Sequence, residues 1–392
     1  MSSWSSAIIV VVAAIALWPA EAQQPATDGF SLTTGDRLED PGWWPTKGEA
    51  ARNQYVGTET CKGCHSAIAA LQETTPMYHA GVRARQSEIL KKHEVLTLQE
   101  GDFRYSLSHT PDGVSYSSSN GVENRGASAS WAFGAGEIGQ TYLLEKMGVY
   151  TEARASYFTS LNSLDITPGQ TSKIPEGIEE SLGNRLDSSV TRLCFGCHTT
   201  AAMTSAVFEP EKAVPGVTCE ACHGPGARHV IAMKAQQYDK GSAAIANPVR
   251  LSPSDSVDFC GACHRTWADV AFGMPSNIGA ASLRFQPFRL EKSRCWGKKG
   301  DARITCIACH DPHQPLVRDL TAYDSKCLAC HSAKGNPQRK TAVYATCKEA
   351  TNKCVSCHMP KYEVPQTHAT FTDHYIRVVP LNRIGAPFTQ EK

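Results

Sequence analysis

The sequence predicts a mainly α-helical chain with much irregular structure and a small β-rich insertion in its first half. The helical prediction rests on a motif that crowds the second half: six copies of Cys-x-x-Cys-His lie within residues 194–358, and their cysteine spacing suits one helical turn. The insertion is predicted for residues 66–193, where alternating apolar segments are separated by turn signals at residues 110–113 and 119–121.

The N-terminus has the pattern of a secretory signal peptide over residues 1–22. An apolar run from Ala7 to Trp18 is too short to cross a bilayer, and Ala20-Glu21-Ala22 resembles a cleavage site. No lysine or arginine precedes the run, so an uncleaved anchor is the alternative. Residues 23–54 follow as a polar leader. We expect a periplasmic or otherwise extracytoplasmic protein with no membrane span after signal cleavage.

Cysteine and histidine are the unusual feature of the composition. The 392 residues include 16 cysteines and 14 histidines, while 39 lysines and arginines nearly balance 38 acidic residues. The neutral balance carries no signature of nucleic-acid binding. So many cysteines and histidines in a long chain indicate metal or haem ligation before they indicate a disulfide scaffold.

Fourteen of the cysteines form seven copies of Cys-x-x-Cys-His, numbered here motif 1 to motif 7 in chain order. The cysteines are Cys61 and Cys64, Cys194 and Cys197, Cys219 and Cys222, Cys260 and Cys263, Cys306 and Cys309, Cys327 and Cys330, and Cys354 and Cys357. The histidines that follow them are His65, His198, His223, His264, His310, His331 and His358.

This motif is the pattern of covalent haem c attachment. Two thiols on one helical turn add to the same porphyrin, and the adjacent histidine binds the iron. Zinc sites and disulfides are the alternatives, but neither requires a histidine fused to every second cysteine. The sequence therefore predicts seven covalently bound haem c groups, each with its iron.

Seven other histidines are candidates for the second axial ligand of each iron. Sequence context favours three of them most, and two more next: His229, His313 and His374, then His79 and His368. His229 begins an apparent helix over residues 227–240. The roles of His93, which lies among charged residues, and of His109, at the end of an alternating strand, stay open. Without them one iron has an open face or takes a methionine sulfur, from Met77 or Met203.

The motif positions also suggest how the chain is organised. Residues 55–193 carry motif 1 and the β-rich insertion, and residues 194–392 form a hexahaem domain. With so few residues for each motif, the porphyrins must supply much of the buried apolar surface of that domain. Cys295 and Cys347 lie outside the motifs. In an oxidising compartment they would form one disulfide, and two separate buried thiols are the alternative.

Several segments resemble the multihaem c-type cytochrome family. Residues 55–65, Tyr-Val-Gly-Thr-Glu-Thr-Cys-Lys-Gly-Cys-His, resemble the opening of the tetrahaem electron-carrier cytochromes of hydroxylamine oxidation. Residues 216–226, 309–313, 354–361 and 371–374 are similar to larger multihaem relatives. The resemblance implies a mainly helical haem scaffold, rings in stacked and perpendicular pairs, and distal ligands at His229, His313 and His374. Many related reductases mark their catalytic haem with a lysine in place of the motif histidine, and all seven motifs here keep the histidine.

The leading hypothesis is a non-catalytic carrier that transfers electrons along closely packed haems, with redox proteins or a respiratory complex as its partners. The enzyme alternative is a reductase or oxidase of a small nitrogen or sulfur compound at one open haem. A third alternative is an electron-transfer subunit of a larger complex or filament. The sequence names neither donor nor acceptor, and it leaves haem order, reduction potentials and oligomeric state open.

Overall fold

The computed structural model describes residues 50–171, 173–275, 278–296, 304–331, 347–384 and 387–388. All of them belong to one compact unit. The predicted signal peptide and nearly all of the predicted leader lie outside the described residues. Within the described ranges, each helix is too short or too polar to span a membrane.

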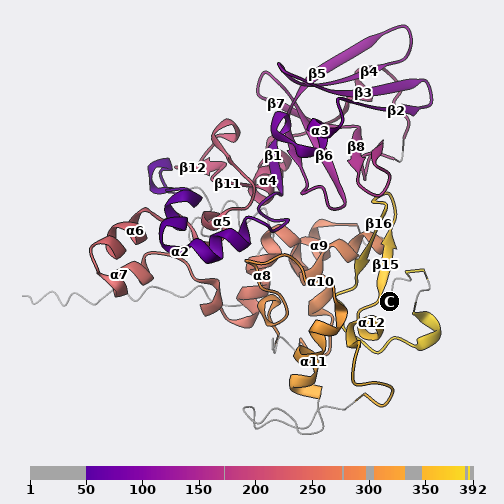
Figure 1. Cartoon of the computed structure of the whole chain (residues 1–392). Helices are drawn as coiled ribbons and strands as arrows, with labels where there is room; N and C mark the ends of the chain where they lie inside the picture. Colours follow the sequence, from indigo (N-terminus) through magenta and orange to yellow (C-terminus); the bar gives the residue numbers. More distant parts are fainter. Residues whose placement is uncertain are drawn as a thin grey trace, which may run out of the picture. The chain divides into compact units, whose positions relative to one another are not determined.

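A ten-stranded antiparallel sheet occupies the chain between motifs 1 and 2 (Figure 1). Its main path is β10-β7-β6-β5-β4-β3-β2, with β1 paired to β5, and β8 paired to both β6 and β9. The strands are β1 (Gly81–Arg83), β2 (Val95–Glu100), β3 (Phe103–Thr110), β4 (Gly113–Ser119), β5 (Asn124–Phe133), β6 (Gly139–Lys146), β7 (Val149–Ala153), β8 (Ala155–Phe158), β9 (Ser163–Ile166) and β10 (Gly183–Arg185).

This sheet shows that the mainly α-helical prediction, with only a small β-rich insertion, was wrong. The described residues combine helices with a large sheet, because successive hairpins pair along the chain into one continuous structure. The alternation of Phe103, Tyr105 and Leu107 in β3 was visible in the sequence. The short strands β1 and β10, which join the sheet at three residues each, have no comparable local signal.

Alternating side chains and tight turns explain why this segment forms strands. In β3, Phe103, Tyr105 and Leu107 are buried while the residues between them are more exposed, as expected for a strand with one face on a core. The turn predicted at residues 110–113 is confirmed, since Thr110 pairs with Gly113 across the β3–β4 hairpin. Gly113 has a φ of 148°, which favours glycine.

The sheet has an apolar core on each face. Seventeen buried residues form the first core, which includes the fully buried Tyr105 and Tyr142. The second core includes Leu143, which lies between two first-core residues of β6 and therefore points to the opposite face. Phe195, from inside motif 2, packs into this second core against Trp131. The sheet thus anchors the helix that carries motif 2.

Short helices account for most of the remaining described structure. They are α2 (Thr58–Gln72), α3 (Glu88–Lys92), α4 (Ser188–His198), α5 (Cys219–His223), α6 (Ala227–Lys234), α7 (Tyr238–Ala243), α8 (Pro253–His264), α9 (Trp267–Gly273), α10 (Gln286–Glu291), α11 (Asp324–His331) and α12 (Cys354–His358). Small two-stranded sheets pair β11 (Thr199–Thr200) with β14 (Val214–Pro215), β12 (Met203–Thr204) with β13 (Val207–Phe208), and β15 (Lys361–Val364) with β16 (Ala369–Thr372).

Side-chain caps fix where two of the motif helices begin. Asp187 Oδ1 accepts the backbone N–H of Val190 at the start of α4. Ser252 Oγ does the same for Asp255 at the start of α8. The prediction of a single helix over residues 227–240 was wrong, because this segment forms two helices, α6 and α7. Gln236, between them, adopts a φ of 57° that ends the helical conformation.

Candidate haem-binding sites

Each Cys-x-x-Cys-His motif lies on a short helical segment. Helices α4, α8 and α11 end at their motif histidine, and α5 and α12 consist of the motif alone. Motif 1 lies inside α2, where His65 leaves the helical conformation with φ −113° and ψ 39°. Motif 5 begins with a 3-10 turn, η7 (Cys306–Ala308). The two thiols of a motif are therefore close enough along one turn to attach to one porphyrin.

Cysteines of different motifs lie beside one another at several places in the described chain, where the segments that carry them pack together. The pairs are Cys61 with Cys219, Cys197 with Cys263, Cys260 with Cys306, and Cys327 with Cys354. These contacts bring motif 1 to motif 3, motif 2 to motif 4, motif 4 to motif 5, and motif 6 to motif 7. The motifs therefore neighbour one another in an order that differs from their order along the chain.

Two further contacts connect the remaining motifs. Cys222 of motif 3 packs with Cys260 and Cys263 of motif 4 in one apolar cluster. His310 of motif 5 lies edge-on to Tyr323, with ring centres 5.7 Å apart, and Tyr323 directly precedes α11, which carries motif 6. The motifs consequently follow one another as 1-3-4-5-6-7, with motif 2 branching from motif 4.

Three motif histidines face a second histidine. The ring centres of His65 and His229 lie 6.3 Å apart, those of His223 and His313 6.0 Å, and those of His310 and His374 6.2 Å. Two imidazoles on opposite sides of one iron have ring centres roughly 6 Å apart, since each metal–nitrogen bond is about 2 Å long. The donor atoms and their spacing therefore fit haem iron. The three partner histidines are those that sequence context ranked first.

Backbone carbonyls orient several of these imidazoles through Nδ1. His229 Nδ1 donates to the Gly241 carbonyl at 2.9 Å, and His374 Nδ1 donates to the Thr372 carbonyl at 3.0 Å. Three motif histidines do the same at 2.8 Å: His198 to Ala80, His223 to Ala246, and His358 to Arg377. When Nδ1 carries the hydrogen, Nε2 keeps the lone pair that can bind a metal.

Burial favours the neutral form of several histidines at these sites. It lowers the pKa of His374 to about 4, and the nearby His310 adds to this effect. Burial likewise lowers the pKa of His198, His264 and His310. Neutral imidazole is the form that coordinates metals, so these environments suit ligation at neutral pH.

The other spare histidines lie in different surroundings. His79 lies edge-on to Tyr78, with ring centres 5.3 Å apart, and His93 is tilted against Tyr157 at 5.6 Å. His109 Nε2 is hydrogen-bonded to the Arg85 carbonyl at 3.2 Å. His368 Nε2 is 2.7 Å from Asp165 Oδ2. In His109 and His368, the nitrogen that commonly binds iron is thus engaged with the sheet region.

The disulfide predicted between Cys295 and Cys347 is not formed. Both are free thiols, Cys295 partly buried and Cys347 exposed. Cys295 instead lies near two motif cysteines: burial raises its pKa most, and the charges of Cys309 and Cys327 raise it further. Among the described residues, no three or more His, Cys, Asp or Glu side chains gather as a metal-ion site, so the zinc alternative gains no support from them.

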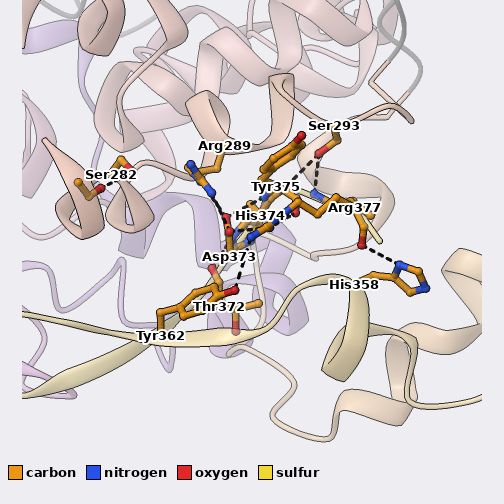
Figure 2. Close-up of polar contacts among 12 residues, drawn as sticks. Ser282, Arg289, Ser293, His358, Tyr362, Thr372, Asp373, His374, Tyr375 and Arg377 are labelled. Atoms are coloured by element: carbon orange, nitrogen blue, oxygen red, sulfur yellow. Dashed lines mark hydrogen bonds and ion pairs between the residues drawn. The ribbon is translucent and has the colours of Figure 1, made fainter. Parts of the chain in front are cut away.

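A buried charge cluster beside His374 was not predicted from the sequence (Figure 2). Asp373 accepts hydrogen bonds from Arg289 at 2.8 and 2.7 Å and from Arg377 at 2.8 Å. Figure 2 also shows the Arg377 carbonyl receiving the hydrogen bond from His358. The sequence marks the segment around Asp373 through the neighbouring His374, but Arg289 lies 84 residues earlier. No local sequence pattern links the two.

Comparisons with known proteins give matches to multihaem cytochromes. Residues 160–224 match the family model described as cytochrome c554 and c-prime. The multiheme cytochrome MtrA of Shewanella baltica (strain OS185) is 25% identical over 183 aligned residues, which cover 37% of this chain and 54% of that relative. The chain thus spans about half the length of this curated relative. The crystal structure of the outer cell wall cytochrome OcwA superposes with a TM-score of 0.46 and 18% identity, covering 83% of this chain and 80% of that one.

The matches to the cytochrome c554 family and to MtrA, together with the motifs, support a multihaem c-type cytochrome. Proteins of this class bind haem c covalently through cysteine thiols and transfer electrons through its iron. Electron transfer by a multihaem cytochrome is therefore the function that these findings support.

Proposed function

We propose that the chain carries seven haem c groups and transfers electrons among them, between redox partners outside the cytoplasm. The observation that carries this proposal is the series of packing contacts between the motif segments, from motif 1 to motif 7 with motif 2 as a branch. Attachment segments in contact favour short distances between the groups that they hold. Once bound, haem iron supplies a one-electron redox centre at each motif.

The residues of the chain would hold these groups in three ways. The fourteen motif cysteines attach them, and the seven motif histidines bind one side of each iron. His229, His313 and His374 bind the other side for motifs 1, 3 and 5, with Nδ1 of His229 and His374 fixed by backbone carbonyls. Two imidazole ligands change little between oxidation states, which favours electron transfer over chemistry at the iron.

The extracytoplasmic location rests on the N-terminal sequence. Its apolar run and Ala-x-Ala site favour export, and haem c attachment of this kind takes place outside the cytoplasm. The partners are then redox proteins or a respiratory complex, and the neutral charge balance gives no signature of nucleic-acid binding.

An intact-mass measurement combined with a redox titration tests this proposal. The purified protein should have the mass of one chain plus seven haems. In the redox titration, a soluble electron donor should reduce all seven haems of each molecule. A protein with six or fewer haems would contradict the count. Haems that stay oxidised with an excess of a strong soluble reductant, while their neighbours are reduced, would contradict the connected path.

A reductase or oxidase acting at one open haem is the second candidate. It is favoured by the contacts of His109 and His368, whose Nε2 atoms bond to Arg85 and Asp165 instead of facing a motif histidine. An electron paramagnetic resonance spectrum and carbon monoxide binding separate the two functions. A high-spin ferric haem together with turnover of nitrite, hydroxylamine or tetrathionate would favour the enzyme, whereas low-spin haems without turnover would favour the carrier.

A further inference from the structure

The Asp373 cluster, which consists of Asp373, Arg289 and Arg377, lies among the candidate haem ligands. The Asp373 side chain is 0% exposed, and those of Arg289 and Arg377 are 7% and 12% exposed. Burying charges costs free energy that their mutual attraction only partly offsets, so such a cluster is weak evidence of added stability. The cluster is therefore better explained by the neighbouring main chain and side chains that it holds in place.

Asp373 shapes the backbone that follows His374. Its Oδ1 accepts the backbone N–H of Tyr375 at 3.0 Å, while Arg377 Nη1 donates to the Tyr375 carbonyl at 2.9 Å. The guanidinium groups of Arg289 and Arg377 lie 5.4 and 4.6 Å from the centre of the Tyr375 ring. The cluster therefore holds both the main chain and the aromatic ring of this segment.

Ser293 adds a second attachment to the same segment. Its Oγ accepts the backbone N–H of Ile376 at 2.8 Å and donates to the His374 carbonyl at 3.3 Å. Since Ser293 follows α10, which also carries Arg289, one helix end and one carboxylate fix the main chain from residue 373 to residue 377.

This segment serves two different motifs. The His374 ring faces His310 of motif 5, and the Arg377 carbonyl accepts the Nδ1 hydrogen of His358 in motif 7 at 2.8 Å. Hydrogen bonds to the outer nitrogen of a ligating histidine set its tautomer, its ring orientation and its basicity. A displacement of residues 373–377 would consequently alter one axial ligand at each of the two motifs.

We propose that Asp373 is a positioning residue that sets the axial ligands at motifs 5 and 7 together. The inference rests on the proposed function, because it requires haem at both motifs. Two guanidinium groups and one carboxylate leave a net positive charge between the two sites. Neutralising Asp373 increases that charge, which favours reduced iron, and it releases the segment that presents the Arg377 carbonyl to His358.

The test compares D373N with E100Q, a matched control in the sheet. Glu100 accepts two hydrogen bonds from Arg154, at 2.8 and 2.6 Å, and the two side chains are 16% and 7% exposed. Both substitutions therefore neutralise a carboxylate that binds a buried arginine at two points. The readouts are a potentiometric titration of all haems and the low-spin signals in electron paramagnetic resonance.

D373N should move two haem transitions to higher potential and change two low-spin signals, while the others keep their wild-type values. E100Q should lower the unfolding temperature and leave potentials and signals unchanged. If D373N does not yield haem-loaded protein, R289K replaces it in the test. Lysine keeps the positive charge but loses the two-point contact with Asp373, so R289K should change the same two low-spin signals. The proposal is overturned if the variant measured changes no signal, changes only one haem, or matches E100Q.

Peptide mapping of the wild-type protein separates this outcome from the proposed function. If the peptides of motifs 5 and 7 carry haem, the comparison of D373N with E100Q is valid even when another motif lacks haem. A total of fewer than seven haems would then contradict the proposed function and leave the role of Asp373 unaffected. The absence of haem from motif 5 or motif 7 would overturn both.

Discussion

The sheet region and the motif region of this protein build their interiors in different ways. The sheet region, residues 81–185, has a core of seventeen buried residues on one face alone. Among the described residues of the motif region, the apolar clusters contain only two or three buried residues each, such as Val257, Leu290 and Trp296. The sheet region can thus be stabilised by side chains, whereas the motif region depends on the groups attached to its cysteines.

Polar contacts follow the same division. In the sheet, the buried pair of Glu100 and Arg154 connects strands and the loop that follows them. In the motif region, the equivalent pair of Asp373 and Arg289 lies beside candidate iron ligands. The same chemistry therefore contributes to folding in one region and is proposed to orient ligands in the other.

Withholding haem gives the largest expected effect and tests this division directly. Protein made without covalent haem attachment should lose hydrogen-exchange protection in the described residues between α5 and Arg377, because little side-chain core remains there. Strands β2 to β6 should keep their protection. Hydrogen-exchange mass spectrometry against the haem-loaded protein measures both regions in one sample. Equal protection, or equal loss, in the two regions would show that the division is wrong.

The substitution W131A should give the next largest effect, because it opens a cavity where the two regions meet. Trp131 is fully buried and packs against Phe195 of motif 2, so its loss should lower the free energy of unfolding by about 3–5 kcal/mol. Urea unfolding followed by far-ultraviolet circular dichroism measures the change. The control is V122A, at a side chain that is 92% exposed, which should stay within about 0.5 kcal/mol of wild type. Equal effects for the two variants would mean that Trp131 is not part of the core.

The smallest effect is expected from S252A, which removes the cap of the motif 4 helix. Ser252 Oγ accepts the Asp255 N–H at 3.2 Å, and loss of such a cap costs about 1 kcal/mol. S252T should restore most of the stability because threonine can cap in the same way. If S252A lowered the free energy of unfolding as much as W131A, α8 would be stabilised mainly by its own cap. That result would contradict the view that the motif region is stabilised mainly by its attached haems.

Local patterns in the sequence predicted those features that depend on local geometry. Cysteines three positions apart share a helical turn, and Pro-Asp-Gly after Thr110 forms the expected hairpin turn. The extent of the sheet was not predictable in this way, because β1 and β10 join it through pairing with distant strands. The fold class was consequently misjudged, although the strands fall in the predicted interval.

The candidate ligands show the same limit. His229, His313 and His374 were favoured by context, and each faces a motif histidine. His368 had a similar context, yet the β15–β16 turn carries it to Asp165. Whether a histidine reaches a motif depends on tertiary packing, which a single sequence does not encode in any local pattern. The contacts between motifs and the Asp373–Arg289 pair are unpredictable for the same reason.

The contacts of the β15–β16 turn also bear on the order in which the protein can assemble. Three contacts join this turn to the sheet: His368 Nε2 to Asp165, Ser160 Oγ to the His368 carbonyl, and the Gly169 N–H to Gln366 Oε1. They connect residues 197 to 208 positions apart. All strands of the large sheet precede residue 366 in the chain, and motifs 2 to 7 all lie between the two ends of the closure. Docking of the turn is therefore a late step, and the loop that it closes contains every attachment site except the first.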